Sequence, residues 1–589
     1  METADPPVVM VNQAGYLPDF RKTAVYRGAE TDPVEFELVD AAGVVLLRER
    51  TQVYGPDTAS GDLVHRIDFS NWKDEGGPLR LRVNGQYSQP FSVGKDVYRK
   101  MKLDALSFFY HQRSGVPIEM PFAGRENLAR PAGHPEDAAV ECLPPDAFIF
   151  TSGQVDRRYA CSGVRDVSGG WYDAGDHGKY VVNGGAALWT LLNLFERARY
   201  GGSNFHQFAD GTLSIPENTN RVPDILDEAR HELAFFLKMQ EEKGPFAGML
   251  HHKIHSDQWT GLPLAPHADT MPRHLYPVTT QATLNGAAVF AMAARIYDTY
   301  DREFAATCLK AAKAAWKAAK KNPQVVASTD GGHGGGPYDD PRADDEFYWA
   351  AAELFITTGE EVYKKELVAS RYFKVVPSFL EFDEADGVFT WKDIAPLGNL
   401  SLAVTPSRLG VADVIAIRRN IINAAAQFAK KAGATGYGAP LTVGPKGTYP
   451  WGSNSNIINA LIVMGLAFDF SGDLSFVDEA ADAMGYLLGR NPMDTCYVTG
   501  YGARPVRHPH HRFFADQLDP AFPAPPPGIF SGGPNSGIQD DHVKELLKGC
   551  APAKCYVDHI QSWSTNEIAI NWNASFAWVA AFLDDAGTR

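Results

Sequence analysis

The sequence has little cysteine, no excess of basic residues and no long apolar run, and each absence excludes a class of protein. Six cysteines among 589 residues are too few for a disulfide-dense scaffold. Lysine and arginine number 55 against 71 aspartates and glutamates, so the net charge of −16 offers nothing to nucleic acid or to an anionic membrane. No run of about 18 apolar residues is present, and no segment is expected to span a membrane. A neutral ligand is the natural partner.

The chain is long and apolar enough for more than one buried core, and its first part reads as strands. Apolar residues make up 44% of the sequence. Leu79, Leu81 and Val83 alternate with polar residues, and similar runs from about residue 8 to 94 are separated by turn signals such as Asn84-Gly85. This pattern predicts a small β-sandwich of immunoglobulin type over residues 1–95.

Helical spacing begins after residue 95 and continues to the end of the chain, which makes residues 100–589 a mainly α domain. Ala-rich amphipathic segments predict helices over 184–197, 224–240, 281–297, 302–320, 345–355, 412–431, 454–468, 476–488 and 566–583. Antiparallel helix pairs suit either an open solenoid or a closed α/α barrel. Long Gly- and Pro-rich loops at 117–166, 331–342 and 500–537 favour a barrel with a cleft at one end.

The segment 169–180, Gly-Gly-Trp-Tyr-Asp-Ala-Gly-Asp-His-Gly-Lys-Tyr, carries two carboxylates three residues apart, Asp173 and Asp176. Its glycines let the backbone turn so that both side chains reach one point. Such a pair can hold a water and deprotonate it. A simple turn or a calcium loop is the alternative. The flanking Trp171 and Tyr172 favour a sugar subsite, because aromatic faces stack on pyranose rings.

A second cluster, Arg507-His-Pro-His-His-Arg512, lies in a long loop. Three histidines within four positions could bind a metal, but the two arginines would oppose a cation. We interpret the cluster as donors to sugar hydroxyls or as partners of a carboxylate.

Glu567 follows Asn566 where the last helix is predicted to begin. Alone, it reads as a first-turn glutamate that the helix dipole favours.

Together these motifs carry a resemblance to a known family. The Asp-Ala-Gly-Asp, Pro-His-His-Arg and Asn-Glu motifs, in this order, resemble those of glycoside hydrolase family 9, the inverting cellulases. Residues 11–16 resemble the start of the immunoglobulin-like domain of bacterial members, and 222–228 and 347–354 resemble their barrel helices. The resemblance covers nearly the whole chain and implies an (α/α)6 barrel after the β-sandwich.

The resemblance also implies roles for individual residues. Asp176 would be the general base, Asp173 would share the nucleophilic water, and Glu567 would be the general acid. Inversion needs the acid and base carboxyls about 6.5–9.5 Å apart, with a raised pKa at Glu567 and both aspartates charged. The expected sugar-binding residues are His510, Arg512, Trp171, Tyr172, Tyr449, Trp451 and Asn454.

No cofactor is expected for catalysis, but metals are expected to matter for structure. Many family members hold zinc after the first barrel helix, whereas Ser114 and Gly133 stand here where thiolates are expected, leaving His134 alone. We therefore expect no zinc. The carboxylates Asp340, Asp345 and Glu346 are expected to bind structural calcium, and a solvated acidic helix start is the alternative.

The leading hypothesis is a monomeric endo-β-1,4-glucanase acting on cellulose, cello-oligosaccharides or related β-glucans. An exo-acting cellobiosidase, cellodextrinase or exo-β-glucosaminidase is the alternative, and a non-catalytic glycan-binding protein would not need all three carboxyls. A polysaccharide substrate implies secretion. The first seven residues have neither a basic end nor an apolar stretch, so we expect a signal peptide to be missing from this sequence. Cys550 and Cys555 are close enough to pair if the turn through Pro552 allows it.

Overall fold

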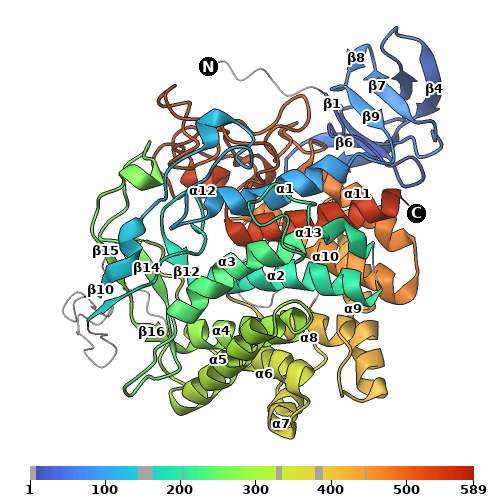
Figure 1. The fold of residues 1–589 in the computed structure, drawn as a ribbon. Coiled ribbons are helices and arrows are strands. Elements are labelled where there is room, and N and C mark those ends of the chain that lie inside the picture. Colours follow the sequence, from blue (N-terminus) through green and yellow to red (C-terminus); the bar gives the residue numbers. More distant parts are fainter. Residues whose placement is uncertain are drawn as a thin grey trace.

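Two antiparallel sheets form the N-terminal part of the chain in the computed structural model (Figure 1). One has the strand order β1-β2-β6-β5, and the other has β4-β3-β7-β8, with β9 paired to β7. The strands are β1 Val9–Met10, β2 Thr23–Arg27, β3 Glu35–Val39, β4 Val45–Arg50, β5 Gln52–Pro56, β6 Leu63–Asp68, β7 Gly76–Val83, β8 Gln86–Tyr87 and β9 Phe91–Val93. Alternate residues, among them Phe36, Leu81 and Val83, face a shared core, which confirms the predicted sandwich.

Helices dominate the rest of the chain, and α1 (Arg99–Gln112) begins soon after β9 ends. The predicted division into residues 1–95 and 100–589 falls within this link and stays a prediction. The structure describes residues 8–143, 163–201, 204–326, 335–377, 389–444 and 447–588. The predicted loop 117–166 lies partly outside these ranges.

Twelve of the described helices form two concentric rings, the (α/α)6 barrel that the resemblance implied. The inner helices are α2 Val181–Tyr200, α4 Thr280–Tyr297, α6 Asp344–Thr358, α8 Ala395–Val404, α10 Ser453–Ser471 and α13 Ile570–Gly587. The outer helices are α1, α3 Asp224–Lys238, α5 Arg302–Lys321, α7 Glu361–Ala369, α9 Val411–Gly433 and α11 Ser475–Leu487. In the inner ring α2 packs on α4, α4 on α6 and α6 on α8, while α13 packs on both α10 and α2.

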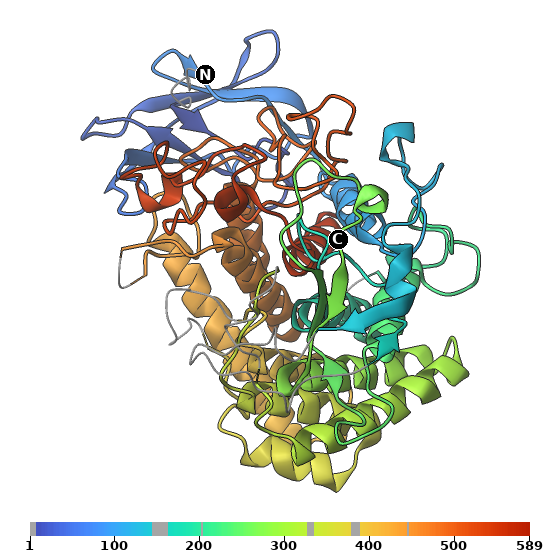
Figure 2. The same cartoon turned by 90° about the vertical axis from the view of Figure 1, so that its left-hand side faces the viewer.

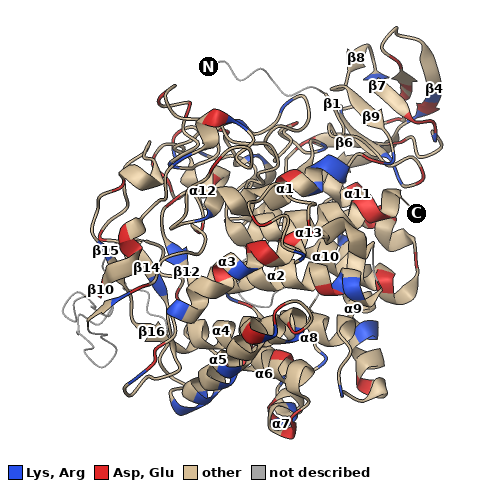
Figure 3. Cartoon of the chain, in the orientation of Figure 1, with Lys and Arg blue, Asp and Glu red and all other residues tan. Residues whose placement is uncertain are grey.

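Burial explains which helices are inside. The inner α4 is buried at every position except Arg295, because its sequence is apolar or small on all sides. The outer α5 buries one stripe, which includes Cys308, Ala312 and Ala315, and exposes its lysines. Figure 3 shows acidic and basic residues interspersed on these outer elements.

A further sheet, which the sequence did not predict, lies at the left-hand side of the helices in Figure 1. Its order is β11-β10-β15-β14-β12, with bounds β10 Val140–Cys142, β11 Val164–Arg165, β12 Lys179–Tyr180, β14 Lys253–Ser256 and β15 Arg273–Leu275. A separate pair joins β13 Leu250–His251 to β16 Val278–Thr279. The strands are too short to show a clear alternation. They matter for function because β12 and β14 lie side by side next to the Asp173 loop.

The sandwich contacts the barrel through a loop near the C-terminal end, as the turned view shows (Figure 2). Lys554 Nζ lies 2.6 Å from Asp62 Oδ1, and Ala553 N donates to Ala59 O. This loop is closed by the disulfide Cys550–Cys555, and Cys142 is also disulfide-bonded. Among the described helices, none has the length and apolar character needed to cross a membrane.

Candidate active site

The loop that carries Asp173 and Asp176 is a tight turn above the barrel. Asp173 N donates to Gly178 O at 2.9 Å, and Gly178 N donates to Asp176 Oδ2 at 3.0 Å. A Cβ at Gly175 would collide with the carbonyl oxygen of His510, so only glycine allows this approach. The glycines of the motif therefore allow the aspartate loop to lie against the histidine loop, a contact that the sequence analysis did not predict.

Backbone hydrogen bonds join the three motifs. Arg512 N donates to Gly175 O at 3.0 Å, which ties the histidine loop to the aspartate loop. His510 N donates to Asn566 O at 2.9 Å, and His510 pairs with Glu567 in a short parallel bridge. Motifs far apart in the sequence thus meet at one place.

Glu567 lies outside any helix, which corrects the prediction that the last helix starts at Asn566. A short helix, α12 (Trp563–Asn566), ends just before it, and Glu567 itself is extended at φ −72° and ψ 159°. Helix α13 begins only at Ile570, whose N–H donates to Asp173 O at 2.9 Å. The helix-dipole interpretation of Glu567 is therefore wrong, and its side chain belongs to the link between the two helices.

The surroundings push the pKa values of the three carboxyls apart. Burial, followed by the charges of Asp176 and Asp173, raises the pKa of Glu567 well above its usual range. Burial and the charge of Asp176 raise the pKa of Asp173 to about 7. Burial also disfavours the charged form of Asp176, but contacts with His255, Arg512 and Gly178 N outweigh it and hold that pKa well below its usual range.

At neutral pH this site combines a protonated Glu567 with an ionised Asp176. The expectation that both aspartates stay fully charged fits Asp176 alone, because burial and the charge of Asp176 raise the pKa of Asp173. A neutral acid opposite a charged base is the arrangement that acid–base hydrolysis needs.

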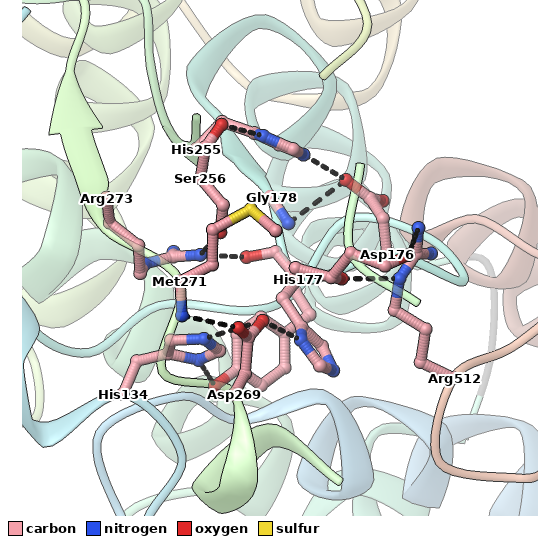
Figure 4. Close-up of polar contacts among 12 residues, drawn as sticks. His134, Asp176, His177, Gly178, His255, Ser256, Asp269, Met271, Arg273 and Arg512 are labelled. Carbon is pink, nitrogen blue, oxygen red and sulfur yellow. Dashed lines mark hydrogen bonds and ion pairs between the residues drawn. The ribbon is translucent and has the colours of Figure 1, made fainter. Parts of the chain in front are cut away.

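Sequence reasoning missed several residues that contact the aspartates. His255 Nε2, from β14, lies 3.1 Å from Asp176 Oδ2 (Figure 4), and Tyr180 OH donates to the same oxygen at 3.2 Å. Tyr338 OH donates to Asp173 Oδ2 at 2.6 Å, and Asn183 Nδ2 donates to Asp173 Oδ1 at 2.5 Å. No local pattern marks His255 or Tyr338, because the contacts are made only when distant segments fold together.

Two predicted sugar-binding aromatics face inward, and this corrects their assignment. Trp171 has no exposed surface and donates from Nε1 to Glu228 Oε1 at 2.8 Å. Tyr172 is 2% exposed, and its hydroxyl lies 2.6 Å from His134 Nδ1. The glycines at 169 and 170 both have positive φ and turn the chain, so these rings pack behind the aspartates. Neither presents a face on which a sugar could stack.

The other predicted sugar-binding residues divide by exposure. Trp451 is 42% exposed, hydrogen-bonds to Glu567 and packs against Trp563 at 5.1 Å between ring centroids. Tyr449 and Asn454 are buried, and Asn454 Nδ2 donates to Ser531 O, so these two support the site from behind.

On the side of Asp176, the prediction missed an exposed tryptophan. Trp259 is 55% exposed and packs against His255 and under the guanidinium of Arg512. Arg512 itself donates to Gly175 O and to Thr260 Oγ1, which makes it a support of the loop. His510 is half-buried with its Nδ1 2.6 Å from Ile560 O, so its Nε2 is the atom left for a ligand.

The three carboxylates predicted to bind calcium do come together. Each of Asp340, Asp345 and Glu346 offers an oxygen, and these oxygens lie within 4.8 Å of one another. Asp340 Oδ2, Asp345 Oδ1 and Glu346 Oε2 are buried without a hydrogen-bond partner. Burial raises the pKa of Asp340 to about 7 and that of Glu346 well above its usual range. Orphaned carboxylate oxygens of this kind fit a hard cation.

His134 is not alone, contrary to the reasoning behind the zinc prediction. His177 Nδ1 lies 2.7 Å and His134 Nε2 3.3 Å from Asp269 Oδ2 (Figure 4). These three side chains could also contact a metal. A closed structural zinc site takes four ligands, and a Cβ at Gly133 would collide with the Tyr172 hydroxyl, so a cysteine does not fit there. The residues present do not match a thiolate zinc site.

Comparisons with known proteins agree with the site. The description "Glycosyl hydrolase family 9" matches residues 98–580, and "Cellulase N-terminal ig-like domain" matches residues 4–88. The fold and the matching family descriptions define a glycoside hydrolase of the cellulase class. The chain belongs to glycosyl hydrolase family 9.

Relatives within the family have different names. A "Cellulose 1,4-beta-cellobiosidase" of Acetivibrio thermocellus is 48% identical over 98% of this chain and 67% of its own length. "Endoglucanase C" of Cellulomonas fimi is 42% identical over 99% of this chain, but the chain spans only 52% of that protein. The crystal structure of the family 9 endoglucanase J30 has a TM-score of 0.83 at 29% identity, covering 96% of this chain and 99% of that one.

The opposite pKa shifts of the two aspartates predict opposite effects on stability. Because the pKa of Asp173 is raised to about 7 from 3.8, the folded state loses stability as the pH rises from about 4 to 7. Asp173→Asn should therefore raise the free energy of unfolding at pH 8, by roughly 1–4 kcal/mol, and change it little at pH 4. Denaturant unfolding at both pH values measures this.

Asp176→Asn is the matched control. Its pKa is held low, so the charged form supports the fold above about pH 4, and the variant should lose stability at pH 8. If both substitutions shift stability in the same direction, the assignment of a neutral and a charged aspartate is wrong.

Proposed function

We propose that this chain hydrolyses β-1,4-glucosidic bonds in cellulose, cello-oligosaccharides or related β-glucans with inversion of configuration, and acts mainly on internal bonds. The observation that carries the proposal is the pairing of Glu567, whose pKa is raised, with Asp176, whose pKa is lowered, in one buried site. The chemistry uses protein carboxyls alone and calls for no catalytic cofactor.

The mechanism follows from these protonation states. Glu567 gives its proton to the leaving glycosidic oxygen, while Asp176 removes a proton from a water that attacks the anomeric carbon on the opposite face. Asp173 shares that water and is held by Tyr338 and Asn183. A single displacement of this kind gives a product of inverted configuration. His510 and Trp451 are the residues best placed to bind the sugar ring beside the acid.

Exposed tryptophans favour attack on internal bonds. Trp451 lies beside the acid and Trp259 beside the base, and both keep a large exposed surface. A stacking surface next to each carboxyl suits a glucan that extends to both sides of the cleaved bond. One relative is named a cellobiosidase and another an endoglucanase. Exo action, as a cellobiosidase, a cellodextrinase or an exo-β-glucosaminidase, is therefore the alternative.

Structural calcium and secretion are part of the proposal. Asp340, Asp345 and Glu346 would hold Ca²⁺ through their unpartnered oxygens, since carboxylates are its preferred ligands. The disulfide Cys550–Cys555 and the bonded Cys142 support an extracellular location, because disulfides persist in oxidising compartments. We propose a monomer.

A product analysis tests the function. Incubation with cellopentaose and with a chitosan pentamer, followed at early times by NMR of the anomeric protons, should give α-configured products from cellopentaose. Fast loss of viscosity of a soluble β-glucan should accompany a slow rise of reducing ends. β-Configured products would contradict inversion, and a steady release of cellobiose without viscosity loss would favour the exo alternative.

Glu567→Gln tests the acid. The amide cannot donate the proton, so kcat on β-glucan should fall by about 10²–10⁴-fold while the affinity for cellotetraose stays within a few-fold. The exposed Glu545→Gln is the matched control and should leave kcat unchanged. Unaltered turnover in Glu567→Gln would refute the assignment.

Removal of calcium should lower stability. A chelator should reduce the thermal midpoint, and readdition of Ca²⁺ at 100 times its Kd should restore about 2.7 kcal/mol. Asp340→Asn should abolish this response, whereas Asp344→Asn, which changes an exposed neighbour, should keep it. A midpoint that ignores both chelator and Ca²⁺ would contradict the cation site.

A further inference from the structure

The segment 336–340 lies between the catalytic aspartates and the carboxylate cluster. On the aspartate side, Gly336 N donates to Tyr180 OH at 3.0 Å, and Tyr180 OH in turn donates to Asp176. Lys253 Nζ donates to Gly336 O at 2.8 Å. On the cluster side, the backbone oxygen of Asp340 accepts from Gln281 Nε2 at 2.7 Å. The segment is thus anchored at both ends.

Tyr338, in the middle of this segment, makes the direct contact with Asp173 at 2.6 Å. Its backbone has φ +46°, a left-handed conformation that a bulky residue adopts only where the surroundings enforce it. Its ring packs against Tyr180 at 4.7 Å and Trp391 at 4.8 Å between centroids. A strained residue that touches a catalytic carboxyl indicates a positioning role.

The hydrogen bonds to Asp340 and Asp345 leave part of the cluster unsatisfied. Asp340, Asp345 and Glu346 have like charges when ionised, and each leaves one buried oxygen without a partner. A bound cation would draw these oxygens together, and Asp340 is only two residues from Tyr338. A second connection runs from Asp345 Oδ2, which accepts from Ile394 N at 3.1 Å, to the neighbouring Trp391 that supports the Tyr338 ring.

We propose that Tyr338 is a positioning residue that couples the cation at Asp340, Asp345 and Glu346 to Asp173, so that cation binding and the catalytic geometry support each other. This inference rests on the proposed function for the role of Asp173 and on the proposed calcium site. The cation holds the segment, the segment holds Tyr338, and the Tyr338 hydroxyl orients the carboxyl that shares the nucleophilic water.

Tyr338→Phe, which removes one hydroxyl, separates coupling from a merely structural role. In the wild type, chelation should lower both the thermal midpoint and kcat. In Tyr338→Phe with calcium, kcat should already be about 10- to 100-fold lower with little change in KM. Chelation should then still lower its thermal midpoint but cause no further loss of kcat.

Tyr372→Phe is the matched control, because its hydroxyl bonds Asp344 beside the cluster and has no contact with Asp173. It should keep kcat and the full response to chelation. The coupling is overturned if Tyr338→Phe retains wild-type kcat, or if chelation lowers kcat by the same factor in Tyr338→Phe as in the wild type.

A measurement that needs no substrate keeps this inference distinct from the proposed function. The shift of thermal midpoint caused by Ca²⁺ is measured in the wild type, Tyr338→Phe, Asp173→Asn and the double variant. If Tyr338 and Asp173 act in the same connection to the cation, each single substitution already breaks that connection. The Ca²⁺-induced shift of the thermal midpoint should then differ from the wild type by the same amount in both single variants and in the double variant. If the changes of the midpoint shift in the two single variants add up in the double variant, the coupling is overturned. If the protein does not hydrolyse glucan, only the proposed function is overturned.

Discussion

Backbone hydrogen bonds between three loops determine where the carboxyl groups meet, and the rest of the site depends on them. Gly175 O accepts from Arg512, Asn566 O accepts from His510, and Asp173 O accepts from Ile570. These bonds join backbone atoms, so none of them occupies the side-chain carboxyl of Asp173, Asp176 or Glu567. The side chains therefore remain available for water and sugar, while the loops that carry them are fixed by buried bonds whose loss would leave unpaired groups.

Burial of three carboxyls in one place is unfavourable, and the protein resolves it by unequal protonation. Asp176 keeps the charge because His255, Arg512 and Gly178 N face it, whereas at Glu567 the charge of Arg512 and the hydrogen bond from Trp451 do not outweigh burial and the two aspartates. The burial and the repulsion that destabilise the fold also raise the pKa of Glu567, which keeps it an acid near neutral pH. Stability and catalysis conflict at this point of the structure.

Local sequence patterns predicted those parts of the structure that local physics decides. Alternation predicted the sandwich, helical periodicity predicted most barrel helices, and the spacing of Asp173 and Asp176 predicted a loop on which two carboxyls could share a water. The partners of these aspartates were not predictable, because Tyr338 lies 165 residues from Asp173 and His255 lies 79 residues from Asp176. Likewise, Trp171 turns inward through its neighbouring glycines, and its aromatic character alone could not show on which side of the loop it packs.

The loops behind the two aspartates are supported in different ways, and the difference follows from donor chemistry. Behind Asp176, His177 and His134 face Asp269, and neutral imidazoles can donate to one carboxylate, although His177 Nε2 is buried without a hydrogen-bond partner. Behind Asp173, the support runs through Tyr338 to three carboxyls that have no donor among themselves when they are ionised. Ionised carboxylates accept hydrogen bonds but cannot donate them, and they repel each other. The histidine–aspartate group therefore offers donors to its own carboxylate, whereas the acidic cluster needs either protons on its carboxyls or a bound cation. Of these two, only a cation allows all three carboxyls to stay ionised at neutral pH.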